Sequence, residues 1–272
     1  MATENKRKLA VVTGASSGIG FHLAKQCTQG GFDVIVCADD AKIHDAAAEI
    51  GTIPTNGDNI GTAQAVQVDL STREGVEMLF QAIQATGRPV DALLLNAGVG
   101  LGGAFLDQNL EANLKMIALN CNHTVHLAKR VLPGMVARRS GRILITASVA
   151  STAPQPYNTV YGATKAFVMA FAEGLRVELK DTGVTVTALQ PGATETEFFE
   201  RANLQNTKVG EAKKDDPAMV AKNGFEAMMA GKDAVLGGGF KSKVEGIMNE
   251  VLPETVKAGQ SAKQNKPMEG KH

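Results

Sequence analysis

Short apolar segments alternate along the chain with longer amphipathic segments. The apolar segments are rich in Val, Ile and Leu and contain few polar residues, which is typical of strands covered on both faces. They span residues 9–12, 34–37, 65–68, 92–95, 142–146, 185–190 and 234–236. Helices are expected between them at residues 18–28, 41–50, 72–86, 108–138, 159–181 and 217–230. This order predicts an α/β fold with a doubly wound parallel sheet of about seven strands and helices on both faces.

The chain has 272 residues, a length that fits one large α/β domain. We expect that domain to span residues 1–256 and a polar, flexible tail to span residues 257–272. Residues 51–63 are interpreted as a surface insertion, and residues 197–216 as either a mobile flap or a long connection. Near the end of the domain, Ile247, Met248, Val251 and Leu252 have the spacing of a short amphipathic helix.

Composition and charge argue against several classes of protein. Hydrophobic residues make up 44% of the chain, enough for a substantial core, and 28 basic residues balance 28 acidic ones. A net charge of zero argues against a nucleic-acid or membrane-surface protein. No apolar run approaches the ~18 residues of a membrane span, and the N-terminus shows no secretory signal. We therefore expect a cytoplasmic protein without nucleic-acid or membrane partners.

The cysteines and histidines show no metal-binding pattern. Cys27, Cys37 and Cys121 are widely spaced and form no C-x-x-C pair, which indicates buried thiols in a reducing compartment. His123 and His126 lie three residues apart on a predicted helix, but no nearby carboxylate or cysteine completes a ligand set. We expect these histidines to pack or to lie in an interface, and we expect no metal site.

A glycine-rich turn, "TGASSGIG" at residues 13–20, follows the first predicted strand and opens the first predicted helix. Gly14 permits a tight turn, Gly18 lets the backbone approach a phosphate, and Gly20 lets the helix pack closely on the sheet. The helix N-terminus offers unpaired N–H groups and a partial positive charge. The segment therefore predicts a dinucleotide site of the Rossmann type, with an ordinary glycine-rich loop as the alternative.

The spacing T-G-x-x-x-G-x-G resembles the signature of the short-chain dehydrogenase/reductase family, and the resemblance extends over about residues 8–240. It implies an NAD(P)-dependent oxidoreductase with a single dinucleotide-binding catalytic domain. It also implies cofactor contacts at matching positions in this chain. Those positions are Gly14, Ser16, Ser17, Gly18, Ile19, Gly20, Asp39, Asp69, Leu70, Asn96, Ala97, Gly98, Tyr161, Lys165, Pro191, Gly192, Thr194 and Thr196.

Asp39 bears on the choice between the two nicotinamide cofactors. It ends the second predicted strand, where a carboxylate can accept hydrogen bonds from both adenosine ribose hydroxyls and repel a 2′-phosphate. Asp40 adds to that repulsion. We therefore expect NAD, although Lys42 could reach a 2′-phosphate and leaves NADP open. The alternative is that Asp39 and Asp40 only cap the next helix.

Candidate chemistry lies in the segment "YGATK". Tyr161 and Lys165 are four residues apart and share a helix face, so the ammonium is expected to lower the phenol pKa and make a general acid/base. Ser148 follows the strand at 142–146 and can hold a substrate oxygen beside Tyr161. By resemblance to the family, Asn120 completes the catalytic set and holds a water that relays protons through Lys165.

The segments expected to line the substrate site are mostly apolar, which favours an uncharged small-molecule ketone or secondary alcohol. They supply Leu101, Val149, Ala153, Pro154, Pro156, Tyr157, Phe198 and Phe199. Glu195, Glu197 and Arg201 are polar exceptions that leave this interpretation open. The resemblance also implies a homodimer or homotetramer, since helices 108–138 and 159–181 pack against their copies in family members.

Two other functions compete with this hypothesis. A dinucleotide-binding sensor or scaffold could keep the fold without turnover, but such a protein has no need of all four residues of the catalytic set. Epimerases and dehydratases among the extended relatives are longer and have a different glycine spacing. Neither feature fits this chain.

Overall fold

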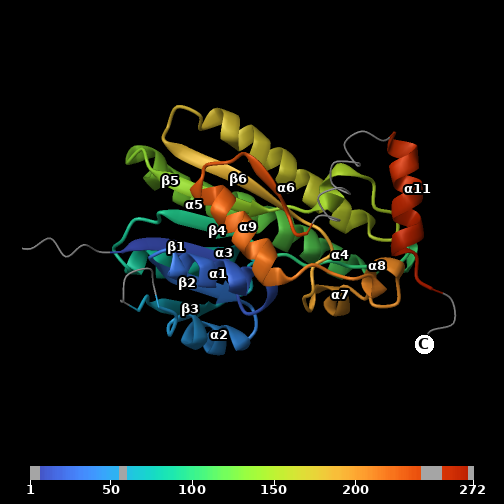
Figure 1. Ribbon diagram of the computed structural model, residues 1–272, viewed down its shortest axis with the longest axis horizontal. Helices are drawn as coiled ribbons and strands as arrows, with labels where there is room; N and C mark the ends of the chain where they lie inside the picture. The colour runs from blue at the N-terminus through green and yellow to red at the C-terminus, as the bar shows by residue number, and fades with distance from the viewer. Residues whose placement is uncertain (1–6, 55–59, 240–252, 269–272) are drawn as a thin grey trace, which may run out of the picture.

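The computed structural model describes residues 7–54, 60–239 and 253–268. Within these residues seven parallel strands form one sheet in the order β3-β2-β1-β4-β5-β6-β7 (Figure 1). The strands are β1 (Lys8–Thr13), β2 (Phe32–Ala38), β3 (Ala63–Gln67), β4 (Ala92–Leu95), β5 (Gly141–Thr146), β6 (Val184–Pro191) and β7 (Ala234–Gly237). The predicted doubly wound α/β fold is confirmed, and each predicted strand overlaps an observed one.

The central strands are buried on both faces because helices cover both, whereas the edge strands β3 and β7 are mostly half-buried or exposed. Within β1, Leu9 and Val11 belong to one core cluster, whereas Ala10 and Val12 belong to the other. The first cluster includes residues of α3 (Arg73–Ala85), α5 (His123–Ala137) and α6 (Thr159–Glu178). The second includes residues of α1 (Gly18–Gln29), α2 (Lys42–Ile50) and α9 (Pro217–Met229). This two-sided burial explains why the central strands show no polar alternation in sequence.

The strand order reverses direction at β1, whose neighbours are β2 on one side and β4 on the other. Loops that leave neighbouring strands at such a point diverge to opposite faces and open a crevice at the carboxyl ends. The glycine turn after β1 and the loop after β4 both lie at this crevice.

The segment predicted as one helix at 108–138 has a more complex form. It contains α4 (Leu110–Ile117), a π-helical turn (Ala118–Asn122) and α5 without a break. The wider turn includes Asn120, one of the predicted catalytic residues. Single π turns inside α-helices occur frequently at functional sites.

Helices occur in two segments for which the sequence predicts neither a strand nor a helix. Residues 197–216 include α7 (Phe198–Arg201) and α8 (Lys208–Glu211). The second segment is the tail at residues 257–272, which the sequence predicts to be flexible. Its first part belongs instead to the helix α11 (Glu254–Asn265). Lys257 and Asn265 of α11 are buried, 6% and 5% exposed, which a loose tail would not produce. The amphipathic helix expected at 247–252 lies outside the described residues.

The three cysteines are free and buried. Cys27 and Cys37 are fully buried in the core, whereas Cys121, 6% exposed, lies in the π-helical turn with its sulfur 3.9 Å from the carbonyl oxygen of Thr164. Across the described ranges, no helix is long and apolar enough to cross a membrane. The same residues contain no group of three or more His, Cys, Asp or Glu that could hold a metal ion.

Candidate active site

The crevice begins at the turn between β1 and α1. Gly14 and Gly18 have left-handed backbone angles, with φ of +66° and +57°. A Cβ on Gly14 would lie 2.7 Å from the Cα of Ala97, and one on Gly20 would lie 2.0 Å from the carbonyl oxygen of Gly14. Close backbone approach thus requires glycine at both positions. The first residues of α1 line the crevice, so the helix N-terminus, where N–H groups lack helical partners, faces a space that could hold an anion such as a phosphate.

Thr13 holds the loop after β4 against this turn. Its hydroxyl accepts hydrogen bonds from the backbone N–H groups of Asn96 at 2.9 Å and Ala97 at 3.0 Å. The Asn96 side chain donates to the carbonyl oxygens of Thr13 and Gly14, both at 3.1 Å. The hydroxyl of Thr146 donates to the Asn96 side-chain oxygen at 3.1 Å. Asn96 therefore ties the ends of β1, β4 and β5 together.

His123 lies beneath this loop and completes its hydrogen bonding. The imidazole is 1% exposed, with Nε2 3.4 Å from the Thr13 hydroxyl and Nδ1 against the carbonyl oxygen of Leu119. A carbonyl oxygen can only accept, so Nδ1 carries the proton and Nε2 is an acceptor. The single proton of the Thr13 hydroxyl has two acceptors within reach, Nε2 and the carbonyl oxygen of Leu94 at 3.5 Å. Burial lowers the pKa of His123 to about 4, which agrees with a neutral ring. The sequence predicts packing at His123, and the structure adds this bond to Thr13.

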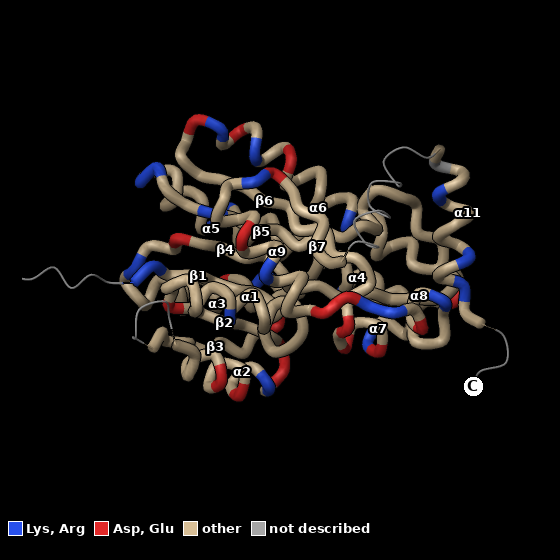
Figure 2. The backbone as a smooth tube through the Cα atoms, viewed as in Figure 1, with Lys and Arg blue, Asp and Glu red and all other residues tan. Residues whose placement is uncertain are grey.

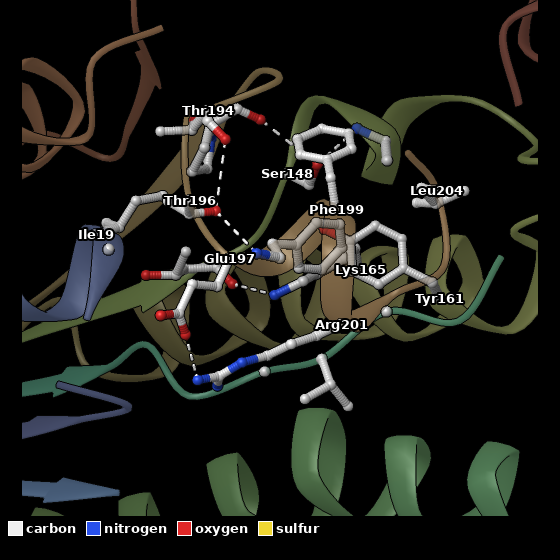
Figure 3. A pocket seen from close by; sticks show the side chains of 18 of the residues that line it. Ile19, Ser148, Tyr161, Lys165, Thr194, Thr196, Glu197, Phe199, Arg201 and Leu204 are labelled. Atoms are coloured by element: carbon white, nitrogen blue, oxygen red, sulfur yellow. Dashed lines mark hydrogen bonds and ion pairs between the residues drawn. The ribbon is translucent and has the colours of Figure 1, made fainter. Parts of the chain in front are cut away.

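Ser148, Tyr161 and Lys165 meet at the carboxyl end of the sheet. Ser148 follows β5 and caps a short 3-10 helix, η3 (Val149–Thr152), by accepting from the Ala150 N–H at 3.1 Å. Its hydroxyl donates to the carbonyl oxygen of Pro191 at 3.4 Å. Tyr161 and Lys165 come from the first turns of α6. All three predicted residues line one cavity (Figure 3).

Burial dominates the protonation of this pair. It raises the pKa of Tyr161 to about 12, while a hydrogen bond with Ser148 acts in the opposite direction. It lowers the pKa of Lys165 to about 8. Burial therefore shifts the tyrosine pKa in the direction opposite to the one expected from the sequence. Lys165 Nζ lies 5.8 Å from the centroid of the Tyr161 ring and donates to the Thr146 carbonyl oxygen at 2.9 Å.

Asn120 lies behind Lys165 and outside the cavity lining. Its side chain is fully engaged: Oδ1 accepts from the Val99 N–H, and Nδ2 donates to the Val99 carbonyl oxygen and the Thr164 hydroxyl, each at 2.9 Å. A Cβ on Gly98 would lie 3.2 Å from Asn120 Oδ1 and 3.3 Å from Lys165 Nζ. Asn120 is therefore close to the cluster, whereas its part in a proton relay stays a prediction.

The cavity has a volume of about 1330 Å³, large for a single small substrate. It is lined by every residue predicted to contact the cofactor. These are Gly14, Ser16, Ser17, Gly18, Ile19, Gly20, Asp39, Asp69, Leu70, Asn96, Ala97, Gly98, Tyr161, Lys165, Pro191, Gly192, Thr194 and Thr196. The structure thus joins the glycine turn and the Ser148–Tyr161–Lys165 cluster in one continuous space.

Carboxylates gather at the end of the cavity near β2 and β3. Asp39 is exposed and lines the cavity. Asp40 accepts from the Ser16 hydroxyl at 3.0 Å and lies 3.6 Å from the guanidinium of Arg201. Asp69 pairs with Lys115 at 3.0 Å. Asp39 has no such cationic partner within the described ranges, so its carboxylate is available to a ligand.

The opposite end of the cavity differs from the sequence expectation. Leu101, Val149, Phe198 and Phe199 line it as predicted, whereas Ala153, Pro154, Pro156 and Tyr157 do not. Residues of α8 and α11 also line it, which the sequence analysis did not anticipate. They are Lys208, Val209, Gln260, Ser261, Gln264 and Asn265, together with Lys213 after α8. A buried amide such as Asn265 within a polar tail has no sequence signal until its partners are known.

The chain matches known proteins over most of its length. The short chain dehydrogenase family model matches residues 8–207. The NADP-dependent 3-hydroxy acid dehydrogenase YdfG of Salmonella typhi is 32% identical over 226 residues, which cover 81% of this chain and 87% of that enzyme.

Solved structures agree with this match. A short-chain dehydrogenase from Sphingobium yanoikuyae in complex with NADPH has a TM-score of 0.77 at 26% identity and covers 90% of this chain and 96% of its own. A 3-ketoacyl-(acyl-carrier-protein) reductase from Brucella melitensis complexed with NADH has a TM-score of 0.73 at 26% identity, with coverage of 85% and 96%.

The family match contains the glycine turn, the loop after β4 and the Ser148–Tyr161–Lys165 cluster, and it ends just before α8. The matched region therefore contains strands β1 to β6 and the crevice at their carboxyl ends, while α8, α9, β7 and α11 lie outside it. From this match and the fold, the chain belongs to the short-chain dehydrogenase family and is an oxidoreductase.

Proposed function

We propose that the protein interconverts a secondary alcohol and a ketone by hydride transfer, with NAD as the preferred cofactor and Tyr161 as general acid/base. The observation that supports this most directly is the shared cavity. Ser148, Tyr161 and Lys165 line the same space as the glycine turn. A substrate oxygen beside Tyr161 would thus lie in the cavity that can also hold a dinucleotide.

The residues present fit a nicotinamide dinucleotide. The turn at Gly14 and Gly18 has no side chains where phosphate would approach, and the N-terminus of α1 favours negative charge there. Thr194 and Thr196 follow β6 and line the cavity, where their hydroxyls can meet a carboxamide. When bound, such a cofactor accepts a hydride from the alcohol carbon or returns one to the ketone.

Tyr161 exchanges the proton that accompanies this hydride. Since its pKa is raised to about 12, the side chain is a neutral phenol near pH 7, the form that donates a proton to a ketone oxygen. Ser148 can donate a hydrogen bond to the same oxygen and orient it. Lys165 and the cationic ring of the oxidised cofactor would lower the tyrosine pKa in the reverse direction, in which Tyr161 accepts the alcohol proton.

Tyr161→Phe tests the chemical role. We expect turnover to fall by about 10²–10⁴-fold, because the variant lacks the proton donor. Affinity for NADH, measured by its fluorescence, is expected to change little. Tyr157→Phe is the matched control, since the only other tyrosine does not line the cavity. Near-normal turnover by Tyr161→Phe would reject the proposed mechanism.

The preference for NAD depends on Asp39. Relatives of this chain use NADP, NADPH or NADH by their names, so the family does not decide the cofactor. We expect Asp39→Ala to raise kcat/KM with NADP relative to NAD by at least about fivefold, since two charges ~4 Å apart repel by about 1–4 kcal/mol. Asp45→Ala, an exposed carboxylate of α2 outside the cavity lining, is the control. An unchanged cofactor ratio would contradict this role of Asp39.

A sensor or scaffold that binds a dinucleotide without turnover is the alternative function. A panel of secondary alcohols and ketones assayed with both cofactors separates the two. Tight NAD binding without turnover on a broad panel would favour the sensor.

We also propose a homodimer or homotetramer formed through α4, α5 and α6. These helices expose apolar side chains, including Leu110 at 66%, Leu114 at 48% and Phe167 at 46%. Exposed apolar patches of this kind are typical of interfaces. Light scattering coupled to size exclusion gives the oligomeric state, and a monomer at micromolar concentration would reject the proposal.

A further inference from the structure

The helix α11 is fixed beside the active-site loop by two buried polar anchors. Lys257 donates to the carbonyl oxygen of Thr152 at 3.1 Å. Asn265 donates to the Gln155 side-chain oxygen at 3.1 Å and to the Pro156 carbonyl oxygen at 3.2 Å. Lys257 and Asn265 are eight residues apart on one helix face, and their acceptors lie in the segment that directly follows Ser148. The helix therefore has a defined place next to the catalytic cluster.

The face of α11 beside these anchors contributes polar side chains to the cavity. Gln260, Ser261 and Gln264 line the same space as Tyr161. Across from them α8, which contacts α11, contributes Lys208, and the residues after it contribute Lys213. Figure 1 shows α8 and α11 side by side, at the other end of the molecule from the first strands. This end of the cavity consequently offers hydrogen-bond donors and two ammonium groups.

The charges that line the cavity are balanced at the cofactor end. Asp40 lies 3.6 Å from Arg201, Asp69 pairs with Lys115 at 3.0 Å, and Glu197 pairs with Lys42 at 2.9 Å. Asp39 is the remaining lining carboxylate, and the proposed function assigns it to the ribose hydroxyls. The acidic side chains of the lining thus have partners at their own end.

Lys208 and Lys213, the two lysines near α11, have no ion-pair partner among the described residues. Within residues 7–54, 60–239 and 253–268, neither Lys208 nor Lys213 forms an ion pair or a side-chain hydrogen bond, and both are exposed. Glu211, the carboxylate of α8, does not line the cavity. Figure 2 shows Lys and Arg positions around α8 and along α11, and Asp and Glu positions beside α8 as well. An anion is therefore the ligand that complements this end of the cavity.

Apolar side chains separate the lysines from the site of reaction. The ring of Phe198 lies 5.2 Å from that of Tyr161, and the ring of Phe199 lies 5.6 Å from that of Phe198. Leu204 and Val209 continue the lining toward α8. A substrate that spans this space would have its carbonyl at Tyr161, an apolar middle and a charged end.

We propose that Lys208 and Lys213, with the amides of Gln260 and Gln264, bind a carboxylate at the end of the substrate distant from the reacting carbon. The substrate class is thus an oxo acid and the corresponding hydroxy acid. This differs from the uncharged substrate expected from sequence. The inference rests on the proposed function, because it takes Tyr161 as the position of the carbonyl oxygen.

The test compares acids with their own neutral esters. The probes are 5-oxohexanoate, 6-oxoheptanoate and 7-oxooctanoate, each alongside its methyl ester, reduced with NADH or NADPH. For the best chain length we expect kcat/KM to favour the acid by about tenfold, which corresponds to about 1.4 kcal/mol. The preference should weaken as salt is raised, since exposed charges are screened.

A double variant, Lys208→Gln with Lys213→Gln, is expected to bring the acid to parity with its ester, mainly by raising KM for the acid. The loss of kcat/KM should be much smaller for the ester, which has no carboxylate for these lysines to bind. The matched control is Lys263→Gln with Lys266→Gln, which removes the same charge from exposed lysines outside the cavity lining. This control should keep the preference for the acid. Equal use of acid and ester by the unmodified protein, or an equal loss for both in the double variant, would overturn the proposal.

Calorimetric titration of the NAD-loaded protein with the same acids and esters separates this proposal from the proposed reaction. A preference for binding acids that disappears in the double variant supports the subsite even if no probe is turned over. In that case the proposed reaction fails and the carboxylate subsite stands. Absence of any binding preference for the acids overturns the subsite, whatever the turnover.

Discussion

The two ends of the cavity are built in different ways. At the cofactor end, backbone segments pack directly against each other. A Cβ on Gly14 would lie 2.7 Å from the Cα of Ala97, and the Thr13 hydroxyl accepts hydrogen bonds from two main-chain N–H groups. At the substrate end, side chains from α7, α8 and α11 form the wall. Close backbone contacts tolerate few amino-acid substitutions, whereas the side chains of a wall can be substituted one at a time without moving the backbone. The first end therefore suits a constant ligand, and the second a ligand that differs among relatives.

The largest effect is expected from an added methyl group in the glycine turn. Gly14→Ala places a Cβ against Ala97 and puts alanine in a left-handed conformation. The conformation costs ~1–2 kcal/mol and overpacking ~1–3 kcal/mol, so we expect a loss of about 4 kcal/mol in the free energy of unfolding. Urea denaturation measures the loss, and NADH fluorescence is expected to show strongly weakened binding.

Gly87→Ala is the matched control for this variant. Gly87 has φ of +63°, close to the value at Gly14, but a Cβ there would meet nothing within 4 Å. It should lose only the conformational part, about 1–2 kcal/mol, and keep its affinity for NADH. Equal losses in the two variants would show that close approach does not constrain the turn.

Acid should destabilise the cofactor end through His123. Its folded-state pKa of about 4 lies below the ordinary value of 6.5, so the unfolded chain binds more protons between these values. Stability that is present above pH 6.5 is therefore lost as the pH falls towards 4, by up to about 3 kcal/mol from this residue. Urea denaturation at several pH values in this range should show a shallower dependence for His123→Gln.

Carboxylates also titrate in this pH range, so the effect of His123 is measured as the difference between His123→Gln and the unmodified protein. His44→Gln removes an exposed imidazole and should keep the pH dependence of the unmodified protein. The same dependence in His123→Gln and in the unmodified protein would contradict a buried neutral imidazole.

The smallest effect is expected at the substrate end. Asn265→Ala removes two hydrogen bonds and leaves the Pro156 carbonyl oxygen without this donor, at a cost of about 1–2 kcal/mol. We expect faster hydrogen exchange in α11 and a few-fold higher KM for ketones, with little change in NADH affinity. Lys263→Ala, an exposed change on the same helix, should leave both unchanged. Unaltered exchange in Asn265→Ala would show that this anchor does not hold α11.

Local signals explain why much of the molecule is predictable. The strands are short apolar runs, and the glycine turn joins a strand directly to a helix, so each is encoded by consecutive residues. The pair Tyr161 and Lys165 shares a helix face by spacing alone. The parallel topology then brings Ser148 and the glycine turn to the same edge of the sheet. Each of these predictions needs no knowledge of distant contacts.

Long-range contacts explain what the sequence does not reveal. The polar segment that forms α11 has no apolar stripe, and its place depends on bonds from Lys257 and Asn265 to residues over a hundred positions earlier. The direction of the Tyr161 pKa shift likewise depends on how deeply the ring is buried, which spacing does not specify. Lys208 and Lys213 become noteworthy only when the cavity shows that the lining carboxylates of the described residues lie at its other end.

The three buried thiols give the protein intrinsic reporters of motion. A cysteine is alkylated only as an exposed thiolate, so its reaction rate measures how often its surroundings open. Cys27 and Cys37 are covered completely by the sheet and its helices, while Cys121 lies in the π-helical turn near Lys165. Mass spectrometry of alkylated peptides can therefore follow the π-helical turn and the core separately, without an engineered label. If a ligand slows the alkylation of Cys121 but not that of Cys27 and Cys37, its binding reduces opening near the cavity and leaves the core unchanged.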